Sequence, residues 1–254
     1  MIVSAVVISV IIPTLNEERT IVETLRLTAG LGFDEMIVVD GGSTDRTRTI
    51  VKSFQFDDRT SGGSGAALVS RISQADDASR VLLEAPPGRA RQLNAGAQAA
   101  RGDVLLFLHA DTHLPRSARS SIEAAMADQL AVGGRFDVQF DIPSIWSYLI
   151  ATLMNARSRL TRISTGDQAL FVRKEVFEQL GGFRDIPLME DIEFSIRLKR
   201  RGATVALRDR VTTSFRRWEQ QGPLKTVLSM WVLRLLYWTG VSPHRLGRLY
   251  PPAR

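Results

Sequence analysis

Short apolar runs alternate with longer segments of mixed polarity over the first 115 residues. Each run ends at polar residues, which is the pattern of a strand buried on both faces of a sheet. The predicted strands cover residues 6–12, 36–39, 81–83 and 104–108. Helices are predicted from about residue 17, from residue 44 or 45, and over residues 89–100. This alternation predicts an α/β fold whose mostly parallel central sheet carries helices on both faces.

The pattern changes after Pro115. Helices are predicted over residues 116–130, 142–154, 188–201 and 224–238, with strands around 134–140 and over 169–172. Gly202 is expected to end the third of these helices. The last helix is apolar almost all round, so we expect it to pack on the domain, on a sister subunit or on a membrane surface. The polar, glycine-rich residues 55–79 are predicted to form a long surface excursion.

Charge is distributed unevenly along the 254 residues. Residues 194–254 hold 13 Lys and Arg against 2 Asp and Glu, whereas residues 1–193 hold 20 against 25, which gives +6 overall. The basic C-terminal quarter indicates an anionic partner, such as a phosphate or a membrane surface, or else a solvated basic face. It contains no recognisable nucleic-acid-binding module, so a nucleic acid is not an expected partner.

Composition and targeting signals point to the cytoplasm. The chain has no cysteine, which excludes disulfides, thiolate metal sites and a cysteine nucleophile. The apolar N-terminus lacks the basic flank and the cleavage site of a signal peptide. No segment reaches the roughly 20 apolar residues of a spanning helix. We therefore expect a cytoplasmic protein whose only membrane contact would be peripheral, at the inner face.

Two of the predicted strands end on a carboxylate. Asp40 follows residues 36–39. Asp111 comes shortly after residues 104–108, and His109 stands two residues before it. Open α/β sheets bind ligands outside the carboxyl ends of their strands, so both acids should reach one site. A divalent ion held by one or two carboxylates and by substrate oxygens suits such a position. The pattern indicates a site for a metal and a nucleotide.

Several motifs then fall in the order of a known family: PTLNEE at residues 13–18, VVDGGSTD at 38–45, GRARQLNAGAQAARG at 88–102, LHAD at 108–111 and MED at 189–191. Together they resemble the family 2 inverting glycosyltransferases of the GT-A fold, and in particular a small soluble bacterial subgroup. The resemblance covers about residues 6–205. It implies a GT-A domain over 1–222, with a Rossmann-like nucleotide-binding half (about 1–115) and an acceptor half (about 116–222). Residues 223–254 remain as an apolar and basic helical extension.

The resemblance implies a donor side for a nucleotide-sugar. The residues that would bind it are Pro13, Thr14, Leu15, Glu17, Asp40, Arg89, Asn94 and Asp111. Asp40 can accept the ring N–H of a base, and in the family the matching aspartate contacts uracil. Two alternatives stay open. Asp40 could instead cap the following helix, and Glu17 could instead be a carboxylate in the first turn of its helix, where the helix dipole stabilises a negative charge.

The expected metal site departs from the family pattern. Asp111 matches the last acid of the family's DxD motif, but the first acid is absent because the segment reads His109-Ala110-Asp111. The expected cofactor is Mg²⁺ or Mn²⁺. If His109 also coordinates, its imidazole favours manganese over magnesium. The alternative for His109 is a packed histidine at the end of a strand.

An acceptor side is expected around two later motifs. The resemblance makes Asp191 the general base, which must lie within about 2.6–3.2 Å of the acceptor proton's oxygen. Adjacent acids at a helix start point in different directions, so Glu190 takes another role on this side; the alternative is that both acids serve the helix dipole. The remaining residues expected on the acceptor side are Gly166, Asp167, Gln168, Arg217 and Trp218.

These residues predict an inverting, metal-assisted transfer of a sugar from a nucleotide-diphosphate sugar, with UDP or GDP, to an acceptor hydroxyl. The alternatives are a nucleotidyltransferase that makes nucleotide-sugars and a non-catalytic module that binds nucleotides or a membrane surface. A nucleotidyltransferase normally carries a basic, glycine-rich loop after its first strand, whereas residues 13–18 are acidic here. A homodimer is compatible with the apolar last helix.

Overall fold

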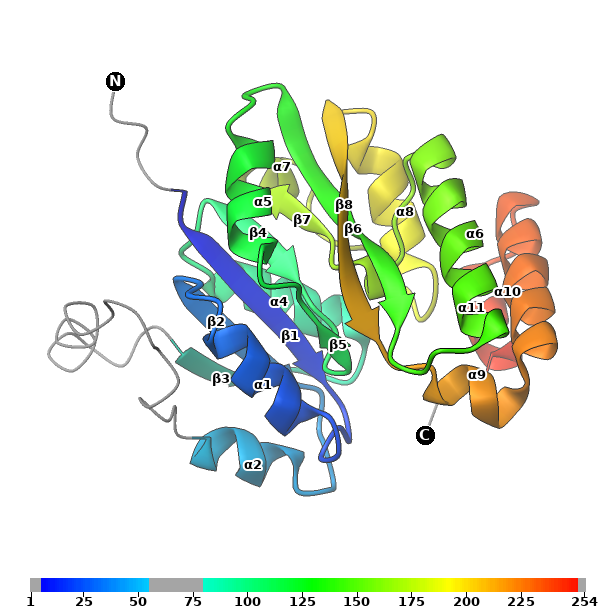
Figure 1. Cartoon of the computed structure of the whole chain (residues 1–254), viewed down its shortest axis with the longest axis horizontal. Coiled ribbons are helices and arrows are strands. Elements are labelled where there is room, and N and C mark those ends of the chain that lie inside the picture. Colours follow the sequence, from blue (N-terminus) through cyan, green and yellow to red (C-terminus); the bar gives the residue numbers. More distant parts are fainter. Residues whose placement is uncertain (1–5, 55–79, 251–254) are drawn as a thin grey trace, which may run out of the picture.

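The computed structural model describes residues 6–54 and 80–250, and the surface excursion predicted over residues 55–79 lies outside them. An eight-stranded sheet runs through the molecule in the order β3-β2-β1-β4-β7-β6-β8-β5 (Figure 1). The strands are β1 (Ile8–Thr14), β2 (Glu35–Asp40), β3 (Arg80–Glu84), β4 (Val104–Phe107), β5 (Thr112–His113), β6 (Ala131–Phe140), β7 (Phe171–Arg173) and β8 (Ala203–Thr213).

The sheet is mixed, and its N-terminal half is parallel as predicted. β1 pairs in parallel with β2 and β4, and β2 pairs in parallel with β3. β7 runs antiparallel to both β4 and β6, and β8 then returns parallel to β6. β5 pairs antiparallel with β8 at the edge. The α/β fold with a mostly parallel sheet is therefore confirmed, with two strands of opposite direction, β7 inside the sheet and β5 at its edge.

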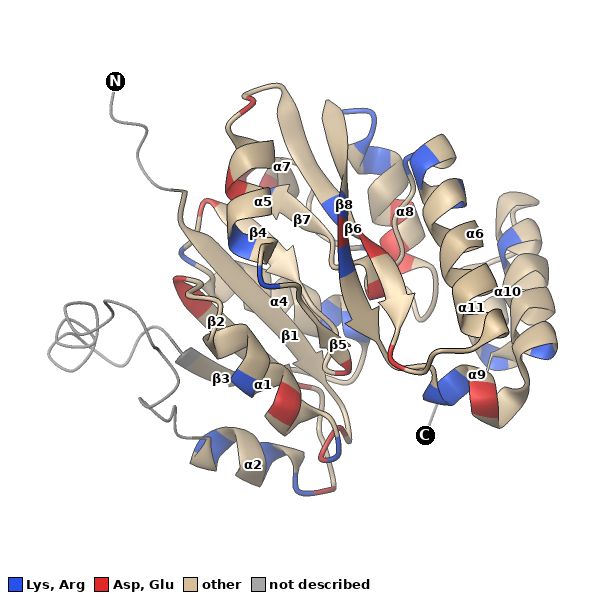
Figure 2. Ribbon diagram, in the orientation of Figure 1, with Lys and Arg blue, Asp and Glu red and all other residues tan. Residues whose placement is uncertain are grey.

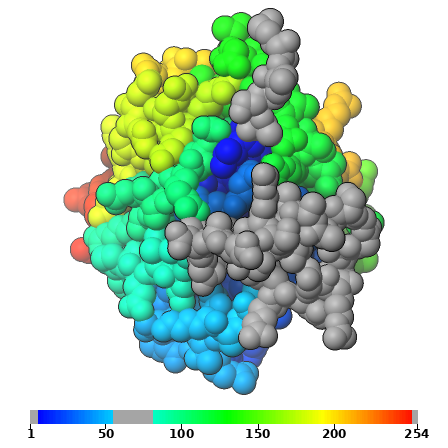
Figure 3. Space-filling model, turned by 90° about the vertical axis from the view of Figure 1, so that its left-hand side faces the viewer, coloured from blue at the N-terminus to red at the C-terminus, as the bar shows by residue number. Residues whose placement is uncertain are grey.

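Helices cover both faces of this sheet (Figure 1). Residues of α1, α5 and α6 pack in one core cluster, and residues of α4, α7 and α8 pack in a second. Viewed from the side of β3, α4 lies between α2 and the yellow-green segment that contains α7 (Figure 3). The helices are α1 (Ile21–Ala29), α2 (Thr47–Ser53), α4 (Arg89–Ala99), α5 (Ala118–Met126), α6 (Ile145–Thr161), α7 (Lys174–Gln179), α8 (Glu190–Leu198), α9 (Arg216–Gln221), α10 (Pro223–Trp238) and α11 (Pro243–Leu249).

The apolar runs of the sequence serve both clusters at once. In β1, Val10 and Ile12 face the first cluster, whereas Ile11 faces the second. In β4, Leu106 faces the first cluster and Phe107 faces the second. Successive side chains of a strand point to opposite faces, so a strand covered on both sides is mostly apolar. Two buried polar residues, Ser9 of β1 and Glu35 of β2, are hydrogen-bonded to each other (2.6 Å). All of β2 is buried, including its last residue.

Two local expectations for the second half of the chain are corrected. Gly202 does not end a helix, because α8 already ends at Leu198 and its C-cap is Lys199. A Cβ on Gly202 would lie 2.5 Å from Val132, so the glycine is a point of close packing. β8 and the short helices α7, α9 and α11 are additions to the predicted elements.

The C-terminal helices pack on the domain through one side. Ile163, Met189, Ile192, Leu233 and Leu246 form a third, smaller core cluster that joins α8, α10 and α11. The other side of α10 leaves large side chains exposed: Leu228, Trp231, Leu235 and Trp238. The predicted packing on the domain thus accounts for one side of α10, and contact with a subunit or a membrane stays a prediction, as does a domain boundary near residue 222. No helix within residues 6–54 and 80–250 has the length and hydropathy needed to span a membrane.

Candidate functional site

The turn after β2 is organised by Asp40. Its carboxylate is buried, and Oδ2 accepts hydrogen bonds from the backbone N–H groups of Gly42 (3.0 Å) and Ser43 (2.9 Å). Oδ1 accepts from the Ser43 hydroxyl and, at 3.4 Å, from Thr14 Oγ1. Gly42 has a φ of +93°, which favours glycine at this position. Asp40 therefore shapes the turn, and its contact with a base stays a prediction.

A residue that sequence reasoning missed fixes this corner of the site. Gln92 of α4 is buried, and its Nε2 donates to the carbonyl oxygens of Thr14 (2.7 Å) and Val39 (2.9 Å). A Cβ on Gly41 would lie 2.9 Å from the Gln92 side chain. Gln92 thus ties α4 to the carboxyl ends of β1 and β2. The only available signal was a polar residue on the buried face of a helix.

The loops after β1 and β2 are cross-linked into one rim. The Asn16 N–H donates to Ser43 Oγ (2.9 Å), and Asn16 Oδ1 accepts from the Thr44 N–H (2.9 Å). The Glu18 N–H donates to Asp45 Oδ2 (3.1 Å). These bonds hold the loop that contains the predicted donor residues, of which Leu15 is 46% exposed.

Glu17 and Asp111 lie near one another at this edge. Burial raises the pKa of Glu17, and the charge of Asp111 raises it further. A hydrogen bond from Thr20 Oγ1 to Glu17 Oε2 (2.9 Å) acts in the opposite direction on that pKa, as do the charges of Arg216 and His109. The strand-end acid of β4 and the loop after β1 therefore share one electrostatic environment.

The metal prediction can be tested against these side chains. Within the described residues, no group of three or more His, Asp or Glu side chains is arranged to hold a metal ion. Asp111 alone supplies one carboxylate. Mg²⁺ is commonly bound by one or two carboxylates together with substrate phosphates. The residues thus fit a metal whose coordination a diphosphate completes, and they do not form a complete protein cage.

His109 connects the end of β4 to the 3₁₀ turn Gly166–Gln168. Its Nδ1 lies 3.2 Å from Asp167 Oδ1, and a Cβ on Gly166 would lie 2.4 Å from its Nε2. Burial alone would raise the pKa of Asp167, but the hydrogen bond from His109 and the charges of His109, Arg89 and Arg217 lower it. These contacts support the packed-histidine alternative for His109, and metal ligation by it stays a prediction.

The two acids that open α8 point to different partners. Asp191 Oδ2 accepts the Gly166 N–H (2.8 Å), and Oδ1 accepts the Ile192 N–H (2.7 Å). Glu190 is buried and its Oε1 lies 3.2 Å from Arg89 Nη1. Burial raises the pKa of Glu190, and Arg89 opposes that rise. Arg89 thus forms an ion pair with Glu190, whereas Asp191 faces the turn that contains Asp167.

Three predicted site residues have contacts that explain them structurally. Asn94 Nδ2 donates to the Phe183 carbonyl (2.8 Å), and Asn94 Oδ1 accepts the Phe183 N–H (2.9 Å). Gln168 is fully buried, and its Oε1 accepts the Thr165 N–H (3.2 Å). The Trp218 ring packs in an aromatic cluster with Phe140 and Phe215. Their ligand-binding roles stay predictions, and no contact of Asn94 supports a donor role.

Arg217 lies on α9, above the ring of Tyr250, with its Cζ 4.5 Å from the ring centroid. The positive charge of Arg217 helps to lower the pKa of Asp167. The structure thus brings Asp111, Glu17 and His109 together, and continues through Asp167 and Gly166 to Asp191. Asp40 lies at the end of β2, which β1 separates from β4, and within the described residues no contact joins Asp40 to Asp191.

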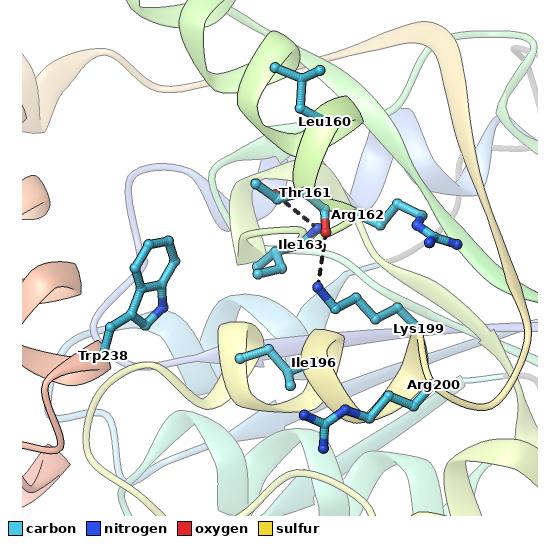
Figure 4. A pocket seen from close by; sticks show the side chains of 8 residues that line it. All are labelled: Leu160, Thr161, Arg162, Ile163, Ile196, Lys199, Arg200 and Trp238. Carbon is cyan, nitrogen blue, oxygen red and sulfur yellow. Dashed lines mark hydrogen bonds between the residues drawn. The ribbon is translucent and has the colours of Figure 1, made fainter.

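An open groove of about 500 Å³ lies elsewhere (Figure 4). It is lined by Leu160, Thr161, Arg162, Ile163, Ile196, Lys199, Arg200 and Trp238. Lys199 Nζ donates to the Thr161 carbonyl across it (3.1 Å). The groove meets the C-terminal half of α8, whereas Asp191 lies at the N-terminus of that helix. Its lining includes none of the predicted site residues.

Comparison with known proteins gives a family and a fold. The family described as "Glycosyl transferase family 2" matches residues 9–181. "Probable glycosyltransferase YdaM" of Bacillus subtilis is 26% identical over 234 residues, which cover 84% of this chain and 50% of that protein. "Glucosyl-3-phosphoglycerate synthase" of Mycolicibacterium smegmatis is 35% identical over 109 residues, 41% of this chain and 30% of that protein. The chain thus spans half or less of the length of these relatives.

A solved structure with the same fold is the mannosyltransferase PcManGT from Pyrobaculum calidifontis, in complex with GDP-Man and Mn²⁺. The TM-score is 0.56 at 22% identity, over 83% of this chain and 57% of that one. At this identity the likeness concerns the fold. It agrees with the GT-A architecture expected from the motifs.

Proposed function

The chain belongs to glycosyl transferase family 2, and on that premise we propose that it transfers a sugar from a UDP- or GDP-sugar to an acceptor hydroxyl. The observation that carries the proposal is the position of Asp191. Two backbone N–H groups hold its carboxylate at the start of α8, beside the turn that His109 connects to the end of β4. An acid is thereby fixed next to the strand ends where α/β sheets bind nucleotides.

On the donor side, the rim made by the loops after β1 and β2 would hold the nucleoside. Asp40 and the segment from Pro13 to Glu17 are the residues proposed to contact base and ribose. PcManGT holds GDP-Man and Mn²⁺, which supports a donor of this class here. Asp111 would hold Mg²⁺ or Mn²⁺ together with the diphosphate, and the ion would neutralise charge on the leaving group.

On the acceptor side, Asp191 would take the proton as the hydroxyl oxygen attacks the anomeric carbon. The bond from that carbon to the diphosphate breaks on the opposite side, so the configuration inverts. Arg89 pairs with Glu190, which leaves Asp191 as the acid that faces the turn. General-base catalysis of this kind contributes about 10²–10⁴-fold to the rate.

A thermal-shift panel of UDP- and GDP-sugars with Mg²⁺ or Mn²⁺ identifies the donor, because a ligand that binds only the folded state raises its stability. In Asp191→Asn we expect nucleotide release to fall at least 100-fold with donor affinity unchanged. Glu175→Gln, an exposed acid on α7, is the matched control and should keep the wild-type rate. Wild-type turnover in Asp191→Asn would remove Asp191 as the base. Donor binding without any nucleotide release in the wild type would instead indicate a binding module.

A further inference from the structure

We infer that Arg157 and Arg234 form an anion subsite on the acceptor side, which takes a phosphate group carried by the acceptor. The inference rests on the proposed transfer reaction, because it names the class of acceptor. Arg157 lies on α6 and Arg234 on α10. Figure 2 shows basic positions on both helices and acidic positions at the start of α8.

Core packing brings these elements to the predicted base. Ile192 and Leu233 belong to the same apolar cluster. Ile192 directly follows Asp191 in the chain, and Leu233 directly precedes Arg234. The negative charge of Asp191 acts to raise the pKa of both Arg157 and Arg234. The two guanidinium groups are therefore within electrostatic range of the same carboxylate, and among the described residues neither forms an ion pair with it.

Both arginines lack a protein partner in the described part of the chain. Arg157 Nε and Nη2 are buried and make no hydrogen bond there. Arg234 has neither an ion pair nor a side-chain hydrogen bond with the described residues. Arg89, in contrast, is paired with Glu190. Burying an unpaired charge is costly, so the buried guanidinium nitrogens of Arg157, next to the half-buried and unpaired Arg234, indicate a missing anionic partner.

The other unsatisfied groups nearby can also donate. Arg217 Nε, Gln168 Nε2 and the Tyr250 hydroxyl are buried without a hydrogen-bond partner in the described structure. Arg217 and Tyr250 are in contact with each other. A phosphate group offers only acceptor oxygens and forms strong, charge-assisted bonds with guanidinium groups. A set of unpaired donors suits such a ligand better than a neutral sugar hydroxyl.

The charges around Asp191 leave a positive balance. Burial and the charge of Arg234 lower the pKa of Arg157 to about 10, although Asp191 acts in the opposite direction. The guanidinium stays charged at neutral pH. Among the described residues, the charges that act on one another here include three carboxylates and four guanidinium groups, those of Asp191, Asp167, Glu190, Arg157, Arg234, Arg89 and Arg217. A phosphomonoester carries about −1.5 to −2 at pH 7 and would balance the positive excess.

The subsite lies on the acceptor side of the site. Leu233, which precedes Arg234, packs in one cluster with Ile192, which follows Asp191, whereas the predicted donor residues Glu17 and Asp111 follow β1 and β4. A phosphate held by Arg157 and Arg234 would therefore place a hydroxyl of the same molecule near Asp191. The phosphate itself is unchanged in the reaction.

Inorganic phosphate is the first probe, titrated into the full chain by calorimetry after UDP or GDP with Mn²⁺ has been added to occupy the donor side. We expect Arg157→Met and Arg234→Met each to weaken phosphate binding at least tenfold, with nucleotide affinity unchanged. Arg248→Gln removes an exposed charge on α11 and is the matched control. Equal phosphate affinity in the wild type and both Met variants would overturn the inference. Nucleotide affinity is measured separately, so its absence would count against the proposed function alone.

Thermal stability supplies a readout that a structural role would not give. Because Nε and Nη2 of Arg157 are buried without a hydrogen-bond partner in the described structure, Arg157→Met should melt at the wild-type temperature or above it. A lower melting temperature with unchanged phosphate binding would show that Arg157 is a structural residue and would overturn its assignment.

Two further arms identify the source of the phosphate. Glycerol 3-phosphate is compared with glycerol, and phosphatidylcholine vesicles that contain phosphatidic acid are compared with vesicles that lack it. Arginine-dependent binding in the first arm assigns a soluble phosphomonoester, and in the second a lipid headgroup. Binding in neither arm would contradict the subsite.

Discussion

Replacing Gly166 with alanine tests the contact that links the end of β4 to the predicted base. A Cβ at this position would lie 2.4 Å from His109 Nε2 and 2.6 Å from its Cε1. Non-bonded heavy atoms normally approach to about 3.5–4.0 Å, so the turn and the imidazole must separate by about 1 Å. Gly166 does not have a left-handed φ, so an alanine fits its backbone conformation and the strain comes from the contact with His109.

The cost follows from that displacement. Overpacking of a well-packed region typically costs about 1–3 kcal/mol, and each kcal/mol lowers the melting temperature of a chain of this size by about 2–4 °C. The same shift would move the Gly166 N–H away from Asp191 Oδ2, which it meets at 2.8 Å. A misplacement of 1 Å can lower turnover about 100-fold. We expect both effects in Gly166→Ala, measured by scanning fluorimetry and by nucleotide release.

The control is Gly30→Ala at the C-cap of α1, where the nearest atom to an added Cβ is 3.6 Å away. It should melt at or slightly above the wild-type temperature. Adding His109→Ala to Gly166→Ala removes the ring that the methyl group meets, so the double variant should recover stability and the two changes should not be additive. Wild-type melting and turnover in Gly166→Ala alone would refute the described contact.

The remaining predictions concern buried polar groups. Gln92→Leu removes the side-chain donor to two strand-end carbonyls, of which that of Thr14 keeps the Gly41 N–H (2.9 Å), so we expect a loss of about 1–3 kcal/mol in urea unfolding and weaker nucleotide binding. Asn94→Ala should lose a similar amount because both backbone groups of Phe183 become unpaired, with nucleotide affinity unchanged; a selective loss of affinity would restore a donor role. Although burial acts the other way, hydrogen bonds from Thr47 and Glu18 lower the pKa of Asp45. Asp45→Ala should therefore be less stable than the wild type at pH 7, and the difference should shrink as the pH falls below about 4; a difference independent of pH would contradict this.

The parts of the fold that could be predicted are those whose signal is local. The parallel strands β1, β2 and β4 are buried on both faces, so each contains an apolar run that alternation alone would not produce. β8 reads ATVALRDRVTT, and only Val211 and Thr213 are buried in it, so its pattern did not distinguish it from a loop. Its place is set by pairing with β6, which is a contact over a long sequence distance.

The end of α6 shows the same limit. The helix was predicted to end at residue 154, yet it continues to Thr161. Asn155 exchanges two hydrogen bonds with the backbone of Val138 (both 2.9 Å), and Arg159 pairs with Asp137 (2.7 Å). From the sequence, these polar side chains would be expected to face solvent. In the structure they bind α6 to β6 through hydrogen bonds and an ion pair.

In the site, the carboxylates at the strand ends could be predicted from their position after apolar runs. Asp111 lies near Glu17, and Asp191 lies against the turn that His109 contacts, as a shared site requires. The role of Gln92 could not be predicted, because its two acceptors belong to strands far away in the chain. The same holds for Asn94, whose partner lies 89 residues later.

The cross-linked loops after β1 and β2 have a consequence for ligand entry. Asn16 and Glu18 are already bonded to Ser43, Thr44 and Asp45. A nucleotide that settles on these loops would therefore freeze few additional backbone torsions. The entropic penalty of association would be correspondingly small, and more of the contact energy would remain as affinity.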